Sequence, residues 1–304
     1  MRKIRNRGNR RPLFGRVRRH RVKYITLLPS LITILNGVFG FAAIVFAAKG
    51  TYPGIGNFTY FEMAGYMVLL AMFADMLDGR LARMSQHTSS FGGQLDSLCD
   101  LVSFGVAPAF LMLTVVEATL QPAGFLYGSF RHRFIWLAAL VYMSCAAIRL
   151  ARFNVENDQS EAAHMSFVGL PSPAAAGVIV SLIILHQQEA SNLVAIIYAL
   201  PFLALATAVL MVSRVRYPHI LNQYLTGEKP FAHLIKVLLF LGLVLWSMQA
   251  ALSLIFCAFA AGGPLKWLYQ RVIRKKVYPA IVTDGPVLGN SSEGQIGQAE
   301  HKPI

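Results

Sequence analysis

The sequence predicts an all-α protein, a polytopic bundle of about eight transmembrane helices. Of its 304 residues, 55% are hydrophobic and only 14% are charged, and the mean hydropathy is +0.51. A soluble domain of this length has a more charged surface, so the composition indicates a bilayer. Residues 24–48 contain no charge, and at about 1.5 Å rise per residue a helix of that length crosses a hydrocarbon core roughly 30 Å thick.

Further apolar stretches follow the first, and each is expected to form a helix. They occupy residues 62–78, 95–116, 134–152, 173–186, 193–213, 231–248 and 250–265. Only residues 247–249 mark a break between the last two, which form either two helices or one long helix. Basic residues precede the first stretch and follow the last, so both ends are expected on the cytoplasmic side, which requires an even number of spans. Arg131 and Arg133 fall in a predicted outer loop and depart from this charge rule.

The charge distribution predicts three regions. Residues 1–23 hold eleven Lys or Arg and no acid, which is typical of a cytoplasmic tail beside anionic headgroups rather than a cleavable signal peptide. Residues 24–265 form the transmembrane domain, and residues 266–304 form a basic, then disordered, cytoplasmic tail. The formal net charge of +14 could suggest nucleic acid, but no aromatic platform or known nucleic-acid-binding motif accompanies it. We therefore expect a multi-pass protein of the cell (inner) membrane that binds no nucleic acid.

Four of the six aspartates fall within one window of 26 residues, and they are Asp75, Asp78, Asp96 and Asp100. The first two are three residues apart and share a face at the end of the second predicted helix. The other two are four apart and share a face at the start of the third. The short link folds the chain back, so the two pairs are expected to confront each other near the cytoplasmic boundary of the membrane. His87, in that link, is expected to be a solvated loop residue.

These carboxylates predict a site for cations. Each costs about 2.5–3.5 kcal/mol in a bilayer on insertion scales, and four together repel one another. Carboxylate oxygens suit Mg²⁺ or Mn²⁺, and no nearby His or Cys set favours zinc. Two divalent cations balance the four negative charges, which favours a two-metal site. A cation transporter is the alternative from another class, but it would distribute its acids over several helices, often in internal repeats.

The whole window resembles the signature of the CDP-alcohol phosphotransferase family. It fills all eight specified positions of the pattern over 26 residues, namely Asp75, Asp78, Gly79, Ala82, Arg83, Gly92, Asp96 and Asp100. The resemblance implies a core of six membrane helices with an active site in a cytoplasm-facing cavity. It also implies that Asp75, Asp78 and Asp96 hold two metals, while Asp100 contacts one of them and serves as general base. Family members are often homodimers, so a homodimer is expected to be compatible with the fold.

The same resemblance implies contacts to the CDP-activated lipid. The residues at family positions for these contacts are Gly79, Ala82, Arg83, Ser89 and Gly92, with Ser30 and Thr33 on the first helix. The family has Pro-Asn before this threonine, whereas Pro29-Ser30 stands here. Two alternatives stay open at this stage. The glycines could serve only close helix packing, and Arg83 could be only a cytoplasmic topology signal.

Two further stretches resemble membrane-integral bacterial phosphatidylserine synthases, namely residues 149–154 (RLARFN) and residues 169–177 (GLPSPAAAG). This implies CDP-diacylglycerol as donor and L-serine as acceptor, with CMP released by direct displacement. Arg149 and Arg152 are the candidates to bind a carboxylate or phosphate of the acceptor, and a purely topological role is the alternative. Glycerol 3-phosphate, inositol phosphate and choline are the alternative acceptors. A phosphate-bearing acceptor would call for a denser basic cluster, which favours serine.

Overall fold

The elements of the fold are almost entirely helical, as predicted. The computed structural model describes residues 14–50, 52, 54–56, 58–85, 90–120, 129–159, 167–188, 194–217 and 247–277. Its helices are α1 (Phe14–Ala48), α2 (Tyr60–Ser85), α3 (Ser90–Asp100), a π-helix (Leu101–Val106), α4 (Ala107–Leu120), α5 (Phe130–Gln159), α6 (Ser172–Gln188), α7 (Val194–Val212) and α10 (Met248–Val277). Two antiparallel strands of two residues each, β1 (Phe167–Val168) and β2 (Arg216–Tyr217), pair Phe167 with Tyr217 and Val168 with Arg216.

Six helical segments in the described part of the chain are long and apolar enough to cross a membrane. They are Ser30–Ala48, Tyr60–Leu81, Phe91–Leu120, Phe130–Val155, Val194–Val212 and Met248–Tyr269, and α6 is a shorter apolar helix. These seven coincide with seven of the predicted stretches, which confirms the membrane-embedded all-α class. The predicted span at residues 231–248 lies almost entirely outside the described residues.

Several helix boundaries differ from the predicted ones, and the largest extensions are those of α1, α2, α5 and α10. α1 begins at Phe14, ten residues earlier than predicted, because Arg and Lys are good helix formers and the basic segment continues the helix of the span. α5 continues past the predicted end at Arg152 to Gln159. α10 begins at Met248, and the Ser247 hydroxyl caps it by accepting a 3.2 Å hydrogen bond from the amide of Ala250. A helix therefore starts at the break noted between the last two apolar stretches.

The buried acid near the start of α2 has a structural explanation. Glu62 forms a capping box with Thr59, in which the Thr59 amide donates to Glu62 Oε2 at 2.7 Å and the Glu62 amide donates to Thr59 Oγ1 at 3.1 Å. The two side chains thus accept hydrogen bonds from backbone N–H groups that would otherwise have no partner at the start of the helix. The charge and the backbone groups at this end of α2 are therefore satisfied by protein partners alone.

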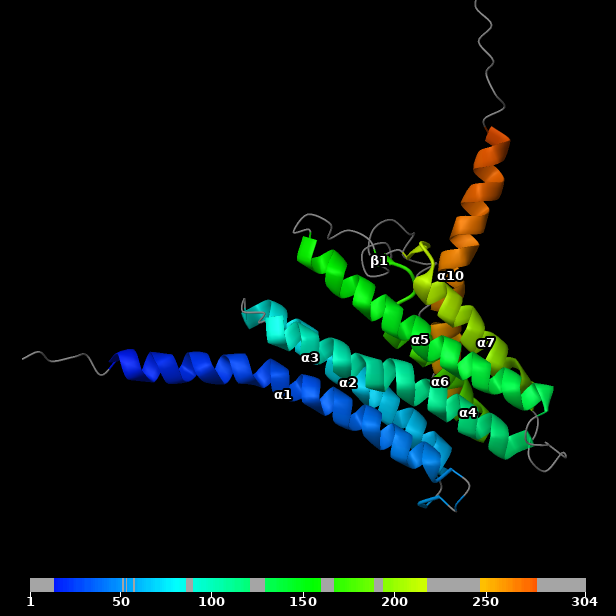
Figure 1. Cartoon of the computed structure of the whole chain (residues 1–304), viewed down its shortest axis with the longest axis horizontal. Coiled ribbons are helices and arrows are strands. Elements are labelled where there is room, and N and C mark those ends of the chain that lie inside the picture. The colour runs from blue at the N-terminus through cyan, green and yellow to red at the C-terminus, as the bar shows by residue number, and fades with distance from the viewer. Residues whose placement is uncertain are drawn as a thin grey trace, which may run out of the picture. The chain divides into compact units, whose positions relative to one another are not determined.

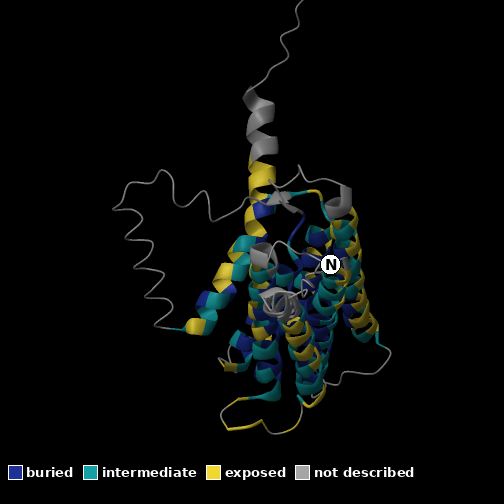
Figure 2. Ribbon diagram, turned by 90° about the vertical axis from the view of Figure 1, so that its left-hand side faces the viewer, coloured by how far each residue is buried: buried dark blue, intermediate teal, exposed yellow. Residues whose placement is uncertain are grey.

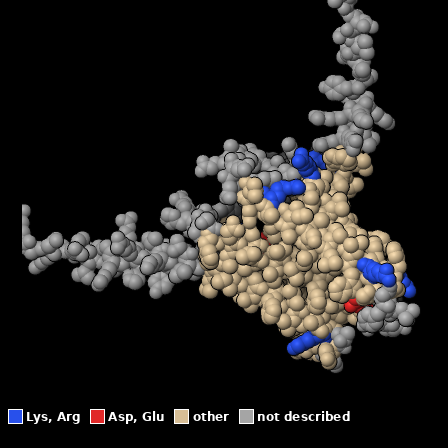
Figure 3. Space-filling view, viewed as in Figure 1, with Lys and Arg blue, Asp and Glu red and all other residues tan. Residues whose placement is uncertain are grey.

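The helices from α1 to α7 pack side by side around a shared apolar core (Figure 1). Buried positions face the neighbouring helices, while exposed positions lie on the outside (Figure 2). In Figure 3 the visible face is largely uncharged, and the Lys and Arg side chains lie toward its ends. An outward-facing apolar surface with charged ends is what a bilayer requires.

Small residues bring α1 close to α3 and the π-helix. A Cβ at Gly37 would lie 3.0 Å from Cys99 Sγ, and one at Gly40 would lie 2.8 Å from Ser103 Cα. Close approach at small residues is a usual basis of helix packing in membranes. It places the polar positions of α1 directly beside Asp100 and the turn that follows it.

Replacing Gly40 by alanine is expected to destabilise the bundle. The added Cβ would overlap Ser103, and overpacking of this kind costs about 1–3 kcal/mol. Thermal unfolding in detergent should show a lower Tm for Gly40→Ala. The control is Gly262→Ala on α10, where an added Cβ meets no atom within 4 Å; an equal Tm for the two variants would contradict the packing described.

Candidate metal centre and active site

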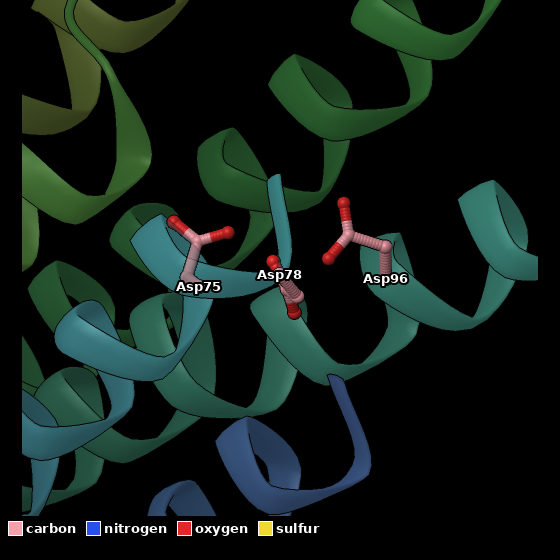
Figure 4. Close-up of side chains that lie close together, drawn as sticks. All are labelled: Asp75, Asp78 and Asp96. Carbon is pink, nitrogen blue, oxygen red and sulfur yellow. The ribbon is translucent and has the colours of Figure 1, made fainter. Parts of the chain in front are cut away.

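Three of the four clustered aspartates lie together. Asp75 and Asp78 on α2 and Asp96 on α3 each offer a carboxylate oxygen, and these oxygens all lie within 4.8 Å of one another. Figure 4 shows the three carboxylates facing a common space between the two helices. The three-residue spacing on α2 places Asp75 and Asp78 on one side of the helix, as predicted. Helix α3 and the last part of α2 therefore bring these three carboxylates close together.

The group has the properties of a cation site. Asp78 is only 4% exposed, and the buried atoms Asp78 Oδ2 and Asp96 Oδ1 have no hydrogen-bond partner. Buried carboxylate oxygens without donors are strongly unfavourable unless a positive charge compensates them. Oxygen-only ligands fit a hard divalent cation such as Mg²⁺ or Mn²⁺. The residues present therefore fit the metal that the sequence predicted.

Asp100 stands apart from this group of three. It is the last residue of α3 and immediately precedes the π-helix. Its Oδ1 accepts a 2.9 Å hydrogen bond from Asn36 Nδ2 on α1, and its carboxylate interacts electrostatically with those of Asp75 and Asp96. Asp100 therefore lies outside the group of three but close enough to interact with it, and it has a partner of its own on α1.

The first helix contributes a second polar contact. Thr33 is 5% exposed, and its side chain hydrogen-bonds to Asp78. Ser30 lies one turn earlier on α1 and is half-buried. Of the two positions predicted on the first helix, Thr33 is thus in direct contact with the acid group.

Of the remaining positions of the signature, the structure describes the surroundings of Gly79 and Gly92. A Cβ added at Gly79 would meet no atom within 4 Å, so the backbone of α2 is open beside Asp78. Gly92 is half-buried on α3. Ala82 and Arg83 lie on the last turns of α2, but their side chains, like Ser89 and His87 altogether, are outside the described residues.

The two predicted arginines of α5 have different surroundings. Arg149 donates from Nη1 to Ser172 Oγ at 2.7 Å and interacts electrostatically with Asp100 and Asp75, while its buried Nε has no partner. Arg152 donates from Nη1 to the carbonyl of Val212 at 3.1 Å. Val212 is the last residue of α7, so Arg152 satisfies a carbonyl at a helix C-terminus. Arg149 is therefore the arginine that faces the acids.

The turn before α6 fixes the partner of Arg149. Gly169 has φ of 87° and donates its amide to the Val215 carbonyl at 2.9 Å, and the Leu170 amide donates to the Leu210 carbonyl at 3.0 Å. A side chain at Gly169 would be strained at that φ and would also collide with the Met211 carbonyl. Ser172, fully buried, starts α6 directly after this turn. The GLPSP stretch thus holds a serine against Arg149.

Two polar links were missed by sequence reasoning. Asn36 holds Asp100, and Ser97 Oγ, next to Asp96, donates to Asn154 Oδ1 on α5 at 3.0 Å. A signal for Asn36 was available, since it is the one amide side chain in residues 24–48 and stands three residues after Thr33. Asn154 stood within the RLARFN stretch but carried no predicted role. Neither partner could be named before the helices were packed.

The fold and the acid group together define a class of membrane transferase. The chain belongs to the CDP-alcohol phosphatidyltransferase family, whose model matches residues 26–216. This match confirms the resemblance carried by the signature at residues 75–100.

Individual relatives share one enzyme name. The chain is 33% identical over 250 residues to the CDP-diacylglycerol–serine O-phosphatidyltransferase of Helicobacter pylori, covering 81% of this chain and 93% of that protein. An enzyme of the same name from Methanocaldococcus jannaschii is 30% identical over 202 residues, 66% of this chain and 79% of that one. One from Saccharomyces cerevisiae is 36% identical over 160 residues, 51% and 52% of the two chains. The similarity therefore extends across bacterial, archaeal and yeast proteins.

Proposed function

We propose that the chain transfers the phosphatidyl group of CDP-diacylglycerol to L-serine, which gives phosphatidylserine and CMP. The observation that carries the proposal is the group formed by Asp75, Asp78 and Asp96, in which the buried atoms Asp78 Oδ2 and Asp96 Oδ1 have no hydrogen-bond partner. It lies inside the family signature, in a chain similar over most of its length to enzymes named for this reaction.

In this proposal Asp75, Asp78 and Asp96 hold two divalent cations, Mg²⁺ or Mn²⁺, and Asp100 contacts one of them. The cations, when bound, neutralise negative charge on the diphosphate oxygens during phosphoryl-type transfer. The acids supply four negative charges, which two divalent cations would balance. The unpartnered oxygens of Asp78 and Asp96 support this assignment.

Asp100 acts as the general base. It accepts the proton of the serine hydroxyl while the serine oxygen forms a bond to the lipid-side phosphorus. The bond from that phosphorus to the bridging oxygen breaks, and CMP leaves with that oxygen and the electron pair. Phosphatidylserine forms in one displacement, with no covalent enzyme intermediate. The separation of Asp100 from the other three acids supports this division of roles.

The CDP moiety is proposed to lie along α2 beside Asp78. The open backbone at Gly79 and the buried hydroxyl of Thr33 support this position. Ala82, Arg83, Ser89, Gly92 and Ser30 complete the proposed CDP-lipid contacts by their positions in the family pattern.

Arg149 is proposed to bind the carboxylate of serine. Its buried Nε has a hydrogen to donate and no acceptor, and its Nη1 is oriented by Ser172. The carboxylate of serine would accept charge-assisted hydrogen bonds from this guanidinium and so satisfy its free donor. Arg152 is proposed to contribute to the same pocket by charge, although its Nη1 donates to α7.

Replacing Arg149 by lysine is expected to raise the KM for serine about tenfold to a hundredfold. Lysine keeps the charge but lacks the planar donors, and a hydrogen bond to a charged group contributes about 1.5–3 kcal/mol. Steady-state assays should show a KM for CDP-diacylglycerol close to that of the native protein. The control is Arg214→Lys at an exposed position after α7; a native KM for serine in Arg149→Lys would contradict the proposed contact.

The reaction is tested with the purified protein in detergent, labelled CDP-diacylglycerol and each alcohol in turn. We expect phosphatidylserine and CMP with serine, loss of both with a chelator, and recovery with Mg²⁺ or Mn²⁺. Turnover with glycerol 3-phosphate, inositol phosphate or choline but not with serine would replace the acceptor. Absence of CMP release with every alcohol and either metal would overturn the transferase itself and favour ion transport.

We also propose a cell (inner) membrane location with both termini and the active site on the cytoplasmic side, and a homodimer. Residues 24–265 are proposed as the transmembrane domain between two basic tails. The excess of Lys and Arg at the two ends of this segment supports the orientation. Protease accessibility of tagged termini in sealed inner-membrane vesicles, and the mass of the detergent-solubilised protein, test these two points.

A further inference from the structure

Asn36 is a fully buried amide inside a membrane span. It lies on α1 one turn after Thr33, with 0% of its surface exposed. Its Nδ2 donates to Asp100 Oδ1 at 2.9 Å, across 64 residues of sequence. A buried polar side chain is unfavourable in a bilayer unless it is hydrogen-bonded. The hydrogen bond to Asp100 satisfies the NH₂ end of this amide, while Asn36 Oδ1 has no hydrogen-bond partner among the described residues.

The backbone of Asn36 is held as well. Ser103 Oγ donates to the Asn36 carbonyl at 2.9 Å, and Ser103 lies in the π-helix that starts immediately after Asp100. Gly40, one turn further along α1, allows this close approach because a Cβ there would overlap Ser103. Asn36 is thus tied to both sides of the junction at which Asp100 sits. π-Helical turns inside α-helices occur frequently at functional sites.

An amide N–H affects a carboxylate in a different way than a cation does. It fixes one oxygen by a directional hydrogen bond but leaves the negative charge on the group. The other oxygen then has a defined direction from which it can accept a proton. A general base needs both of these properties, since it must stay ionised and lie within hydrogen-bond reach of the hydroxyl.

We infer that Asn36 is a positioning residue for Asp100, which it holds through Nδ2 in the orientation needed to accept the proton of the acceptor alcohol. The inference rests on the proposed function, in which Asp100 is the base. Asn36 acts through Asp100 and needs no contact with either substrate. Its loss should therefore lower kcat and leave the binding of CDP-diacylglycerol unchanged.

The test uses Asn36→Leu and Asn36→Ala in the full-length protein. Leucine keeps the branching at Cγ without the donor, and alanine removes the bulk, so a shared effect does not depend on volume. We expect kcat to fall about tenfold to a hundredfold in both, as for other residues that orient an active-site ligand. The KM for CDP-diacylglycerol should stay within about threefold of the native value.

Ser253→Ala is the matched control, because it removes a buried hydrogen bond, at 2.9 Å to the Ser181 carbonyl, between α10 and α6. It should leave kcat unchanged. A native kcat in either Asn36 variant would overturn the inference. So would a fall in kcat accompanied by an equal rise in the KM for CDP-diacylglycerol and a lower Tm, since a general loss of structure would produce that pattern.

Failure of this inference is distinguishable from failure of the proposed function. If Asp100→Asn is inactive while both Asn36 variants keep native turnover, only the positioning role is lost. If Asp100→Asn keeps native turnover, the base itself is wrongly assigned and the inference falls with it. A double variant separates the two further, because Asn36→Leu should add almost no loss once Asp100 is already asparagine.

Discussion

Asp100→Asn is expected to lower kcat by about 10²–10⁴-fold, the range that a general base contributes. Asparagine has nearly the same shape but cannot accept the proton of the serine hydroxyl. Binding of the CDP-lipid should persist, because Asp75, Asp78 and Asp96 form their group without this residue. The measurement pairs CMP release under saturating substrates with calorimetric binding of CDP-diacylglycerol in a short-chain form.

The control for Asp100→Asn is another acid on the same apolar segment. Glu117 on α4 accepts a 2.9 Å hydrogen bond from Trp136 Nε1 and pairs with His132 at 3.2 Å. Glu117→Gln should therefore retain native turnover, since these partners are structural. Full activity in Asp100→Asn would remove the proposed base. Loss of nucleotide binding together with turnover would show that the contact of Asp100 with the cation is needed for nucleotide binding.

Asp75→Asn is expected to reduce both turnover and cation affinity, each by more than about 10²-fold, because loss of a direct ligand should exceed the 10–100-fold cost of losing an outer partner. Activity measured against Mn²⁺ concentration should show a higher half-saturating concentration. Binding of the CDP-lipid should weaken as well. This combination distinguishes a metal ligand from the base, whose replacement spares binding.

For the same variant, Asp75→Asn, the expected effect on Tm relative to the native protein differs between cation-free buffer and buffer with Mn²⁺. In cation-free buffer Asp75→Asn should melt at a higher temperature than the native protein, since one of several mutually repelling, half-buried or buried carboxylates is gone. Adding Mn²⁺ should raise the Tm of the native protein by the usual linkage to ligand binding and raise that of the variant much less. Identical Tm shifts in both proteins would place the cation elsewhere.

Several features of this protein are properties of its local sequence. Uncharged runs such as residues 24–48 identify membrane helices, because a bilayer admits backbone almost only in helical form. The spacing of Asp75 from Asp78 puts them on one helix face, since the helical repeat is fixed at 3.6 residues per turn. The eight specified residues of the signature indicate the family without any coordinates. Helix ends were less well predicted, as α1 and α5 both extend beyond the apolar runs.

Only the tertiary structure decided which partner each polar group has. The contacts Asn36 with Asp100, Arg149 with Ser172 and Arg152 with Val212 join residues 64, 23 and 60 positions apart. Such contacts depend on the closeness and rotation of packed helices, which are set by small residues such as Gly40 and leave no periodic trace in the chain. For the same reason two similar arginines on one helix, indistinguishable in sequence, differ in the structure: one faces the acids and the other satisfies a helix end.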